Sequence, residues 1–202
     1  FVSNFLNIEI DQQNRDKVKN NYWSNIDKIL KKNNYNSTWY YIFIPSKKIP
    51  NSIDALKKIN YLNKNNLNKD NHVIIDGYIT LPIIIKTLYQ WFRINLKLIF
   101  IYKKIFNNKS AKEPFILLLK KSFTNYWFGT GSILNLLYFN LFKRICNNSF
   151  KIAIYLMENQ GWERALNFNW KTKCNNKIVG VPHTAIGFWD LRFFNKIEKY
   201  EI

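Results

Sequence analysis

Residues 151–194 read KIAIYLMENQGWERALNFNWKTKCNNKIVGVPHTAIGFWDLRFF, and this stretch decides the predicted fold. Its two apolar runs, 151–157 and 177–181, have the length and composition of buried strands. The roughly twenty residues between them suit a helical crossover, and such crossovers join parallel strands of one sheet. We therefore expect a strand, helix, strand unit whose two strands end at the same edge of a parallel sheet.

Ionisable residues follow both expected strand ends. Glu158 comes directly after the first run and His183 shortly after the second, so the two are predicted at one crevice of the sheet, where open α/β sheets bind ligands. A carboxylate can accept a proton from a sugar hydroxyl, and a histidine can do the same near neutral pH. We predict Glu158 and His183 as the catalytic residues, one of them acting as general base or transition-state stabiliser.

Substrate-binding residues are predicted around that pair. Arginine guanidinium groups offer forked donors for phosphate or carboxylate, carboxylates hold hydroxyl groups, and flat indole rings suit the faces of sugars. The predicted substrate-binding residues are Gln160, Trp162, Glu163, Arg164, Trp189, Asp190 and Arg192.

Structural interpretations stay open beside this one. Glu163 and Arg164 also fit a solvated helix surface, Trp162 fits a core position, and Asp190 with Arg192 fits a structural ion pair. Polar residues that gather in strand-end loops contribute little to core packing, however, and this favours a ligand-binding role for the group as a whole.

An alternating pattern of strands and helices precedes this unit. The runs 37–44 and 72–76 are typical of buried strands, and a helix that begins near Ser52 lies between them. The apolar stretch 81–106 is typical of a long buried or interfacial helix. The expected fold class is accordingly α/β, a Rossmann-like parallel sheet with flanking helices and a long helical insertion.

The expected domain organisation is one α/β lobe over residues 1–202. It consists of a first βαβα part at 36–106, a helical insertion at 107–149 and the strand, helix, strand unit at 150–194. Because the chain opens on Phe1 and not on a methionine, we expect it to be a fragment of a longer protein.

Two further residues are secondary site candidates. Asp76 lies at the carboxyl end of an expected strand, although an aspartate before a glycine also fits a turn. Ser132 ends the run Gly129-Thr130-Gly131-Ser132, which could hold a phosphate at a helix N-terminus. The dinucleotide fingerprint must follow a strand, and this run follows a helical pattern, so a corner between two helices is the favoured interpretation.

The chain is strongly basic, with 31 Lys and Arg against 13 Asp and Glu and a formal charge of +18. Such a charge concentrates anionic partners, for example nucleotide-sugars, anionic lipids or nucleic acid. An AT-rich genome also over-uses Lys, Asn and Ile, which accounts for much of the excess without any function. Since the aromatic residues lie in periodic apolar runs rather than on an RNA-binding strand pattern, no nucleic acid is expected.

The two cysteines, Cys146 and Cys174, match neither a disulfide framework nor the spacing of a zinc site. We expect reduced thiols, no metal and no cofactor, in a cytoplasmic protein. Residues 1–10 lack the pattern of a secretory signal.

The longest apolar stretch, 81–106, fails as a membrane span because Lys86, Arg93 and Lys97 interrupt it. Its mixture of cationic and aromatic residues would nevertheless suit a peripheral contact with an anionic bilayer. Core packing is the commoner explanation of such a stripe.

Three motifs carry a family resemblance: Glu158-Asn159-Gln160-Gly161-Trp162-Glu163-Arg164-Ala165-Leu166, Gly180-Val181-Pro182-His183-Thr184 and Phe188-Trp189-Asp190-Leu191-Arg192-Phe193-Phe194. Together they resemble a bacterial family of surface-carbohydrate (O-antigen, lipopolysaccharide) biosynthesis proteins, which are similar to glycosyltransferases of the two-lobed GT-B type.

The resemblance implies one lobe of an enzyme that transfers a sugar from a nucleotide-activated donor to a glycan or lipid-linked acceptor. The nucleotide-sugar is then a substrate, and no other cofactor is implied. A second, nucleotide-binding lobe is expected beyond Ile202, and the location is the cytoplasm or the inner face of the membrane. The alternative function is a non-catalytic basic module that binds nucleic acid or an anionic membrane surface.

Overall fold

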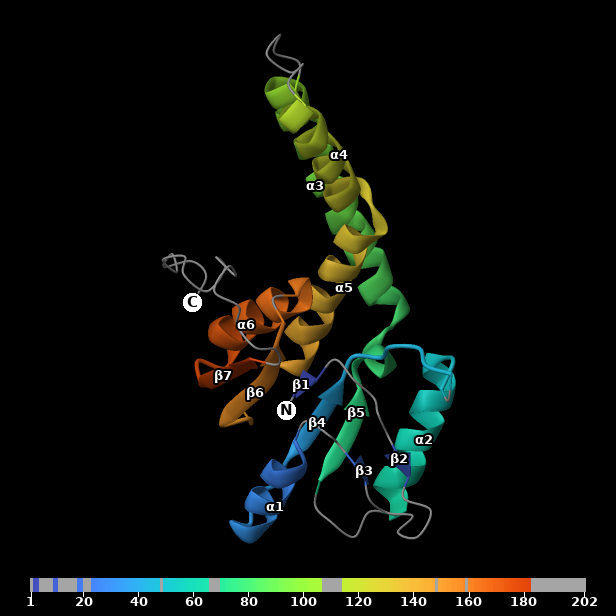
Figure 1. The fold of residues 1–202 in the computed structure, drawn as a ribbon, viewed down its shortest axis with the longest axis vertical. Coiled ribbons are helices and arrows are strands. Elements are labelled where there is room, and N and C mark those ends of the chain that lie inside the picture. The colour runs from blue at the N-terminus through green and yellow to red at the C-terminus, as the bar shows by residue number, and fades with distance from the viewer. Residues whose placement is uncertain are drawn as a thin grey trace. The chain divides into compact units, whose positions relative to one another are not determined.

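The computed structural model describes residues 2–3, 9–10, 18–19, 23–47, 49–65, 70–106, 114–147, 149–158 and 160–182. These residues form two compact units. Unit 1 comprises the described residues within Phe1–Tyr78, Lys151–Glu158 and Lys177–Phe193, and unit 2 comprises those within Ile79–Phe150 and Asn159–Asn176. Figure 1 labels the helices and strands of both units.

Unit 1 is built on a five-stranded parallel sheet in the order β5-β4-β1-β6-β7. Its strands are β1 (Val2–Ser3), β4 (Thr38–Tyr41), β5 (Asn71–Ile74), β6 (Ile152–Met157) and β7 (Lys177–Pro182). Numbered along the chain within this sheet, the order is 3-2-1-4-5, which is that of doubly wound folds of the Rossmann type. The parallel pairing of β6 with β7 confirms the predicted strand, helix, strand unit.

Strand β1 occupies the centre of the sheet although it contains only two residues. Val2 pairs with Tyr40 of β4 on one side and with Tyr155 of β6 on the other. Sequence analysis did not predict this strand, because two residues are too few to show an alternating pattern. A separate antiparallel pair, β2 (Glu9–Ile10) with β3 (Val18–Lys19), was likewise not predicted.

The other two predicted strands are shorter than expected. The run 37–44 forms a strand only at Thr38–Tyr41, and the run 72–76 forms one at Asn71–Ile74. The 3-10 helix η1 (Ile75–Tyr78) follows β5 directly, so Asp76 lies on this turn rather than in the strand. Apolar composition alone does not reveal where the ladder of hydrogen bonds stops.

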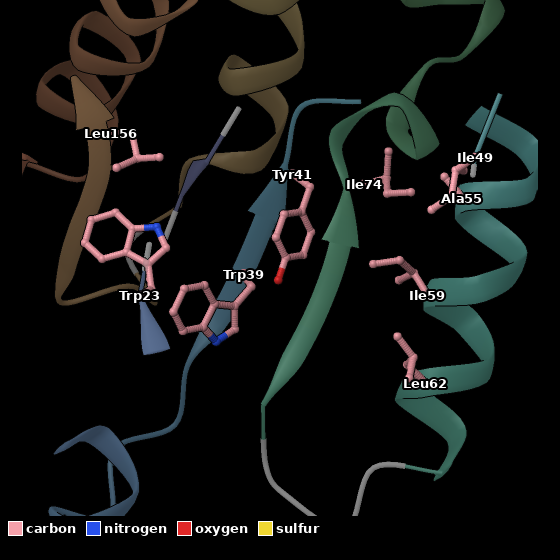
Figure 2. Close-up of a cluster of buried hydrophobic side chains, with 9 residues drawn as sticks. All are labelled: Trp23, Trp39, Tyr41, Ile49, Ala55, Ile59, Leu62, Ile74 and Leu156. Atoms are coloured by element: carbon pink, nitrogen blue, oxygen red, sulfur yellow. The ribbon is translucent and has the colours of Figure 1, made fainter. Parts of the chain in front are cut away.

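The core of unit 1 lies between the sheet and the helices α1 (Ser24–Lys32) and α2 (Ser52–Asn65). Helix α2 presents Ala55, Ile59 and Leu62, whose spacing of three and four places them on one face. Figure 2 shows the nine buried side chains of this cluster: Trp23, Trp39, Tyr41, Ile49, Ala55, Ile59, Leu62, Ile74 and Leu156. Burying each large apolar side chain stabilises the unit by about 1.5–3 kcal/mol.

Polar contacts fix both ends of α2. At its start, the side-chain oxygen of Asn51 accepts the Asp54 N–H at 2.9 Å. Near its end, the Asn63 amide donates to the His72 carbonyl at 2.7 Å and accepts the His72 N–H at 3.0 Å. Strand β5 lies at the edge of the sheet, so Asn63 satisfies backbone groups that a further strand would otherwise pair.

Unit 2 consists of helices. They are α3 (Leu81–Phe106), α4 (Pro114–Phe128), α5 (Thr130–Ile145) and α6 (Gly161–Lys173). The bounds of α3 match the predicted 81–106, with Pro82 in the first turn, where its missing N–H does no harm. Of the helices that the structure describes, none is long and apolar enough to cross a membrane.

Gly129 forms the corner between α4 and α5 and confirms the favoured interpretation of the glycine-rich run. A Cβ atom at Gly129 would lie 2.2 Å from the carbonyl oxygen of Asn125, so no other residue fits without a shift of the backbone. Its φ of −81° and ψ of 173° are extended, which ends one helix and begins the next.

A polar seam joins α3 to α5. The Asn140 side chain, 4% exposed, donates to the Thr87 hydroxyl at 3.1 Å and to the Gln90 side-chain oxygen at 2.7 Å. Asn95 of α3 is also buried, and its amide donates to the Trp91 carbonyl at 2.9 Å. Polar side chains therefore occupy positions where apolar residues usually pack two helices together.

Candidate functional site

Glu158 lies directly beyond the carboxyl end of β6, and its side chain is half-buried. Strand β6 lies next to β1 in the sheet. After β1, the chain adds β4 and β5 on one side of it and later β6 and β7 on the other side. The order of strands reverses between β1 and β6, and open parallel sheets bind ligands outside the carboxyl ends of strands at this point. Glu158 thus occupies the position in unit 1 that is best suited to a ligand contact.

Asp76 lies at the carboxyl end of the same sheet, on η1 after β5. Its carboxylate accepts the backbone N–H of Phe43, which follows β4, and the N–H of Asp76 itself. The Oδ2 atom is buried and has no hydrogen-bond partner among the described residues. Burying a carboxylate oxygen without a hydrogen-bond partner costs desolvation free energy. This atom is therefore suited to accept a hydrogen bond from a ligand.

Burial raises the pKa of the Asp76 carboxyl above its ordinary value, and the N–H groups of Phe43 and Asp76 partly offset this effect. Asp76 and Glu158 cannot act on the same atom, however. Three strand spacings separate β5 from β6, which corresponds to roughly 14 Å. Each carboxylate can contact a different part of one extended ligand.

The predicted substrate-binding residues at the start of α6 divide into two buried and two exposed side chains. Trp162 and Glu163 are 5% and 4% exposed, whereas Gln160 and Arg164 are exposed. Trp162 thus takes the core position that was left open above, and Glu163 does not lie on a solvated helix surface.

Trp162 packs inside unit 2. Its ring lies 6.3 Å from the Phe142 ring between centroids, which agrees with the core interpretation. Trp170, further along α6, is buried in the same way and donates its indole N–H to the Asn176 carbonyl at 2.8 Å. Buried rings of this kind stabilise packing, and neither presents a free face for a sugar.

Glu163 closes the first turn of α6. Its Oε1 atom accepts the Gln160 backbone N–H at 2.7 Å, while the Glu163 N–H donates to the Gln160 carbonyl at 3.1 Å. Gln160 is thus the N-cap of α6, and a carboxylate three residues later satisfies a backbone donor that the helix leaves open. Gly161 lies against the exposed side chain of Asn135, which would have to move to make room for a Cβ atom at this position.

Ser132 does not cap α5, because the N-cap is Gly129 and Ser132 lies inside the first turn. Its hydroxyl oxygen accepts the Trp91 indole N–H at 3.0 Å and lies 2.8 Å from the Trp127 carbonyl and 2.9 Å from the Gly129 carbonyl. These contacts give Ser132 a structural role that links α3 to the corner.

His183, Trp189, Asp190 and Arg192 lie outside the described residues. The predicted meeting of Glu158 with His183 therefore stays a prediction. Within the described part of the chain, no group of three or more His, Cys, Asp or Glu side chains is arranged to hold a metal ion.

Sequence reasoning missed the polar seam around Asn140. A signal was available, since Thr87, Gln90 and Asn95 recur at spacings of three and five within an otherwise apolar helix. The side chains of Thr87 and Gln90 line the contact between α3 and α5, and Asn95 is buried, while apolar residues of α3 face outward.

No known protein family model matches this chain, and neither a curated protein nor a solved structure is detectably similar to it.

Proposed function

We propose that this chain is a glycosyltransferase-like lobe of the GT-B type that acts in bacterial surface-carbohydrate biosynthesis. It transfers a sugar from a nucleotide-activated donor to a glycan or lipid-linked acceptor, in the cytoplasm at the inner face of the membrane. The position of Glu158 carries this proposal, because it lies beyond the carboxyl end of β6, beside the point where the strand order reverses.

The reaction breaks the bond between the anomeric carbon of the donor sugar and its diphosphate oxygen. A bond between that carbon and an acceptor hydroxyl oxygen forms, and the acceptor proton passes to Glu158 or to His183. The nucleoside diphosphate leaves with the bonding electron pair. A carboxylate acts as general base in such a step when it reaches the acceptor hydroxyl within hydrogen-bond distance.

Asp76 supports a ligand at the same sheet edge. Its buried Oδ2 atom has no partner among the described residues and can accept a hydrogen bond from a sugar or ribose hydroxyl. Because the strands before Asp76 and Glu158 are roughly 14 Å apart, a ligand that contacts both residues must be extended, as a nucleotide-sugar is.

Donor turnover in the full-length protein tests the proposal. A panel of uridine and guanosine diphosphate sugars is supplied, and release of the nucleoside diphosphate is measured. Removing a general base costs a factor of roughly 10² to 10⁴ in rate, so the variant that loses it, Glu158→Gln or His183→Ala, should lose most of its turnover.

Asp70→Asn is the matched control, because Asp70 directly precedes β5 and so lies at the amino ends of the strands, opposite the proposed site. This variant should turn over donor at the wild-type rate. If both Glu158→Gln and His183→Ala release nucleotide as fast as the control, neither residue is the general base and the proposal fails.

A further inference from the structure

Helix α3 carries a continuous apolar stripe on its exposed side. Leu81, Ile85, Leu88, Phe92, Leu96 and Ile99 follow one another at spacings of three and four, which places them along one face. All six are exposed, and Leu81, Ile85 and Phe92 are each more than half exposed. We call these six residues the apolar stripe of α3.

A row of cations runs along another side of the helix, roughly 120° around its axis from the apolar stripe. Lys86, Arg93, Lys97 and Lys104 recur at spacings of seven and four, and all four are exposed. Positions so spaced share one side of a helix. Helix α3 therefore has three sides: the polar seam toward α5, the apolar stripe and this cationic row.

The packing of α3 is the reverse of that of a helix that packs on the core of a water-soluble protein. Thr87 and Asn95 are 2% and 6% exposed, whereas Phe100 is 75% exposed. The side-chain oxygens of Asn95 and Asn140 are buried without a hydrogen-bond partner among the described residues. Polar residues between helices and apolar residues outside are typical of helices that contact lipid.

The surroundings of the stripe are cationic. Residues 79–150 contain eleven Lys or Arg and one acidic residue, Glu113. Helices α3, α4 and α5 contain no Asp or Glu at all. An uncompensated charge of this size attracts an anionic surface.

We propose that the apolar stripe and the cationic row of α3 form a docking surface for an anionic lipid bilayer, on which the helix lies in the plane of the interface. The 26 residues of α3 extend for about 39 Å along that plane. The apolar side chains enter the boundary between headgroups and acyl chains, and the lysines extend along it to lipid phosphates.

Other occupants match the surface less well. A second copy would bring the same excess of cations toward this surface, and like charges repel. Nucleic acid would pair with the cations but would leave the apolar stripe exposed to water. A bilayer with anionic headgroups satisfies both features at once, since its negative charges lie directly above its acyl chains.

The docking surface supplies the membrane contact that the proposed function assumes, and its binding is independent of the transfer reaction. Binding is measured without donor or acceptor, and turnover can be measured without vesicles. A failure of one is therefore distinguishable from a failure of the other.

Flotation with vesicles tests the docking surface. The purified chain is mixed with vesicles of phosphatidylcholine containing phosphatidylglycerol, or with vesicles of phosphatidylcholine alone, and the floated fraction is measured. We expect binding to the anionic vesicles that weakens with salt. Replacing Lys86, Lys97 and Lys104 by Gln should lower the partition coefficient about fivefold per lysine, or roughly a hundredfold in total.

The apolar part is tested with the double variant Phe92→Ser and Leu96→Ser, whose side chains are exposed and do not hold the fold together. Its matched control is Ile53→Ser with Tyr61→Ser on α2, where both side chains are also exposed. The control for charge is Lys28→Gln with Lys57→Gln and Lys64→Gln. We expect the α3 variants to lose flotation and both controls to keep it.

Three results would overturn the inference. The first is no flotation with anionic vesicles, and the second is equal losses in the α3 variants and their controls on α1 and α2. The third is a dimer, or a complex with single-stranded RNA, that the wild-type protein forms and the serine variant does not, while the serine variant floats with vesicles as well as the wild type does. Unaltered circular dichroism of each variant establishes that it is folded.

Discussion

Replacing Glu163 tests whether this buried carboxylate closes a helix or binds a substrate. Glu163→Ala removes the acceptor of the Gln160 N–H, which costs about 1 kcal/mol for a cap. It also removes a negative charge at a helix N-terminus, about 0.3–1 kcal/mol, and one buried methylene group, about 0.8 kcal/mol. The free energy of unfolding should fall by roughly 3 kcal/mol.

Glu163→Gln keeps the carbon atoms and one acceptor oxygen, so it loses only the charge contribution of up to about 1 kcal/mol. For a chain of this length the two variants should lower the melting temperature by roughly 6–12 °C and 2–4 °C, respectively. Thermal unfolding followed by far-ultraviolet circular dichroism measures both. The exposed neighbour supplies the control, since Arg164→Ala should stay within about 0.5 kcal/mol of the wild type.

Two outcomes contradict the capping role of Glu163. One is a Glu163→Ala protein as stable as the Arg164→Ala control. The other is a Glu163→Gln protein as unstable as Glu163→Ala, which would mean that the negative charge, and not the acceptor, holds the turn.

Asp76→Asn should change the pH dependence of stability. Because burial raises the folded-state pKa of Asp76, the folded protein holds this proton more tightly than the unfolded chain, and stability is lost as pH rises above the ordinary value of about 3.9. The asparagine variant should match the wild type below that pH and exceed it near neutrality in urea unfolding; a gap that shrinks as pH rises would contradict this. Cys146 provides a second test, since burial raises its pKa to about 12. A thiol reagent at pH 8 should modify Cys146 only on unfolding, and rapid modification of the native protein would contradict its burial.

Much of the fold was predictable because its signals are local. The run 151–157 and the run 177–181 are apolar over enough residues to show strand composition, and the polar stretch between them has room for a helix. Helix α3 was predicted with its observed bounds, since Thr80 and Pro82 mark a helix start. These features depend on neighbouring residues alone.

The rest depends on partners that are distant in the sequence. Strand β1 is recognisable only through Tyr40 and Tyr155, which pair with Val2. The side on which α3 packs was not predictable from apolarity, because its contact with α5 is made through Thr87 and Asn140. For the candidate site, sequence placed Glu158 correctly after a strand, whereas the burial of Trp162 followed from contacts with Phe142.

The two-residue strand β1 has a consequence for how unit 1 assembles. Strands β4 and β5 can pair with each other, as can β6 and β7, but β1 alone joins the two pairs. Val2 must find Tyr155 across most of the chain, and such distant parallel contacts form slowly. Synthesis releases β1 first, yet the sheet closes only after β6 has been made. Folding of unit 1 should therefore be limited by this late insertion of an early segment.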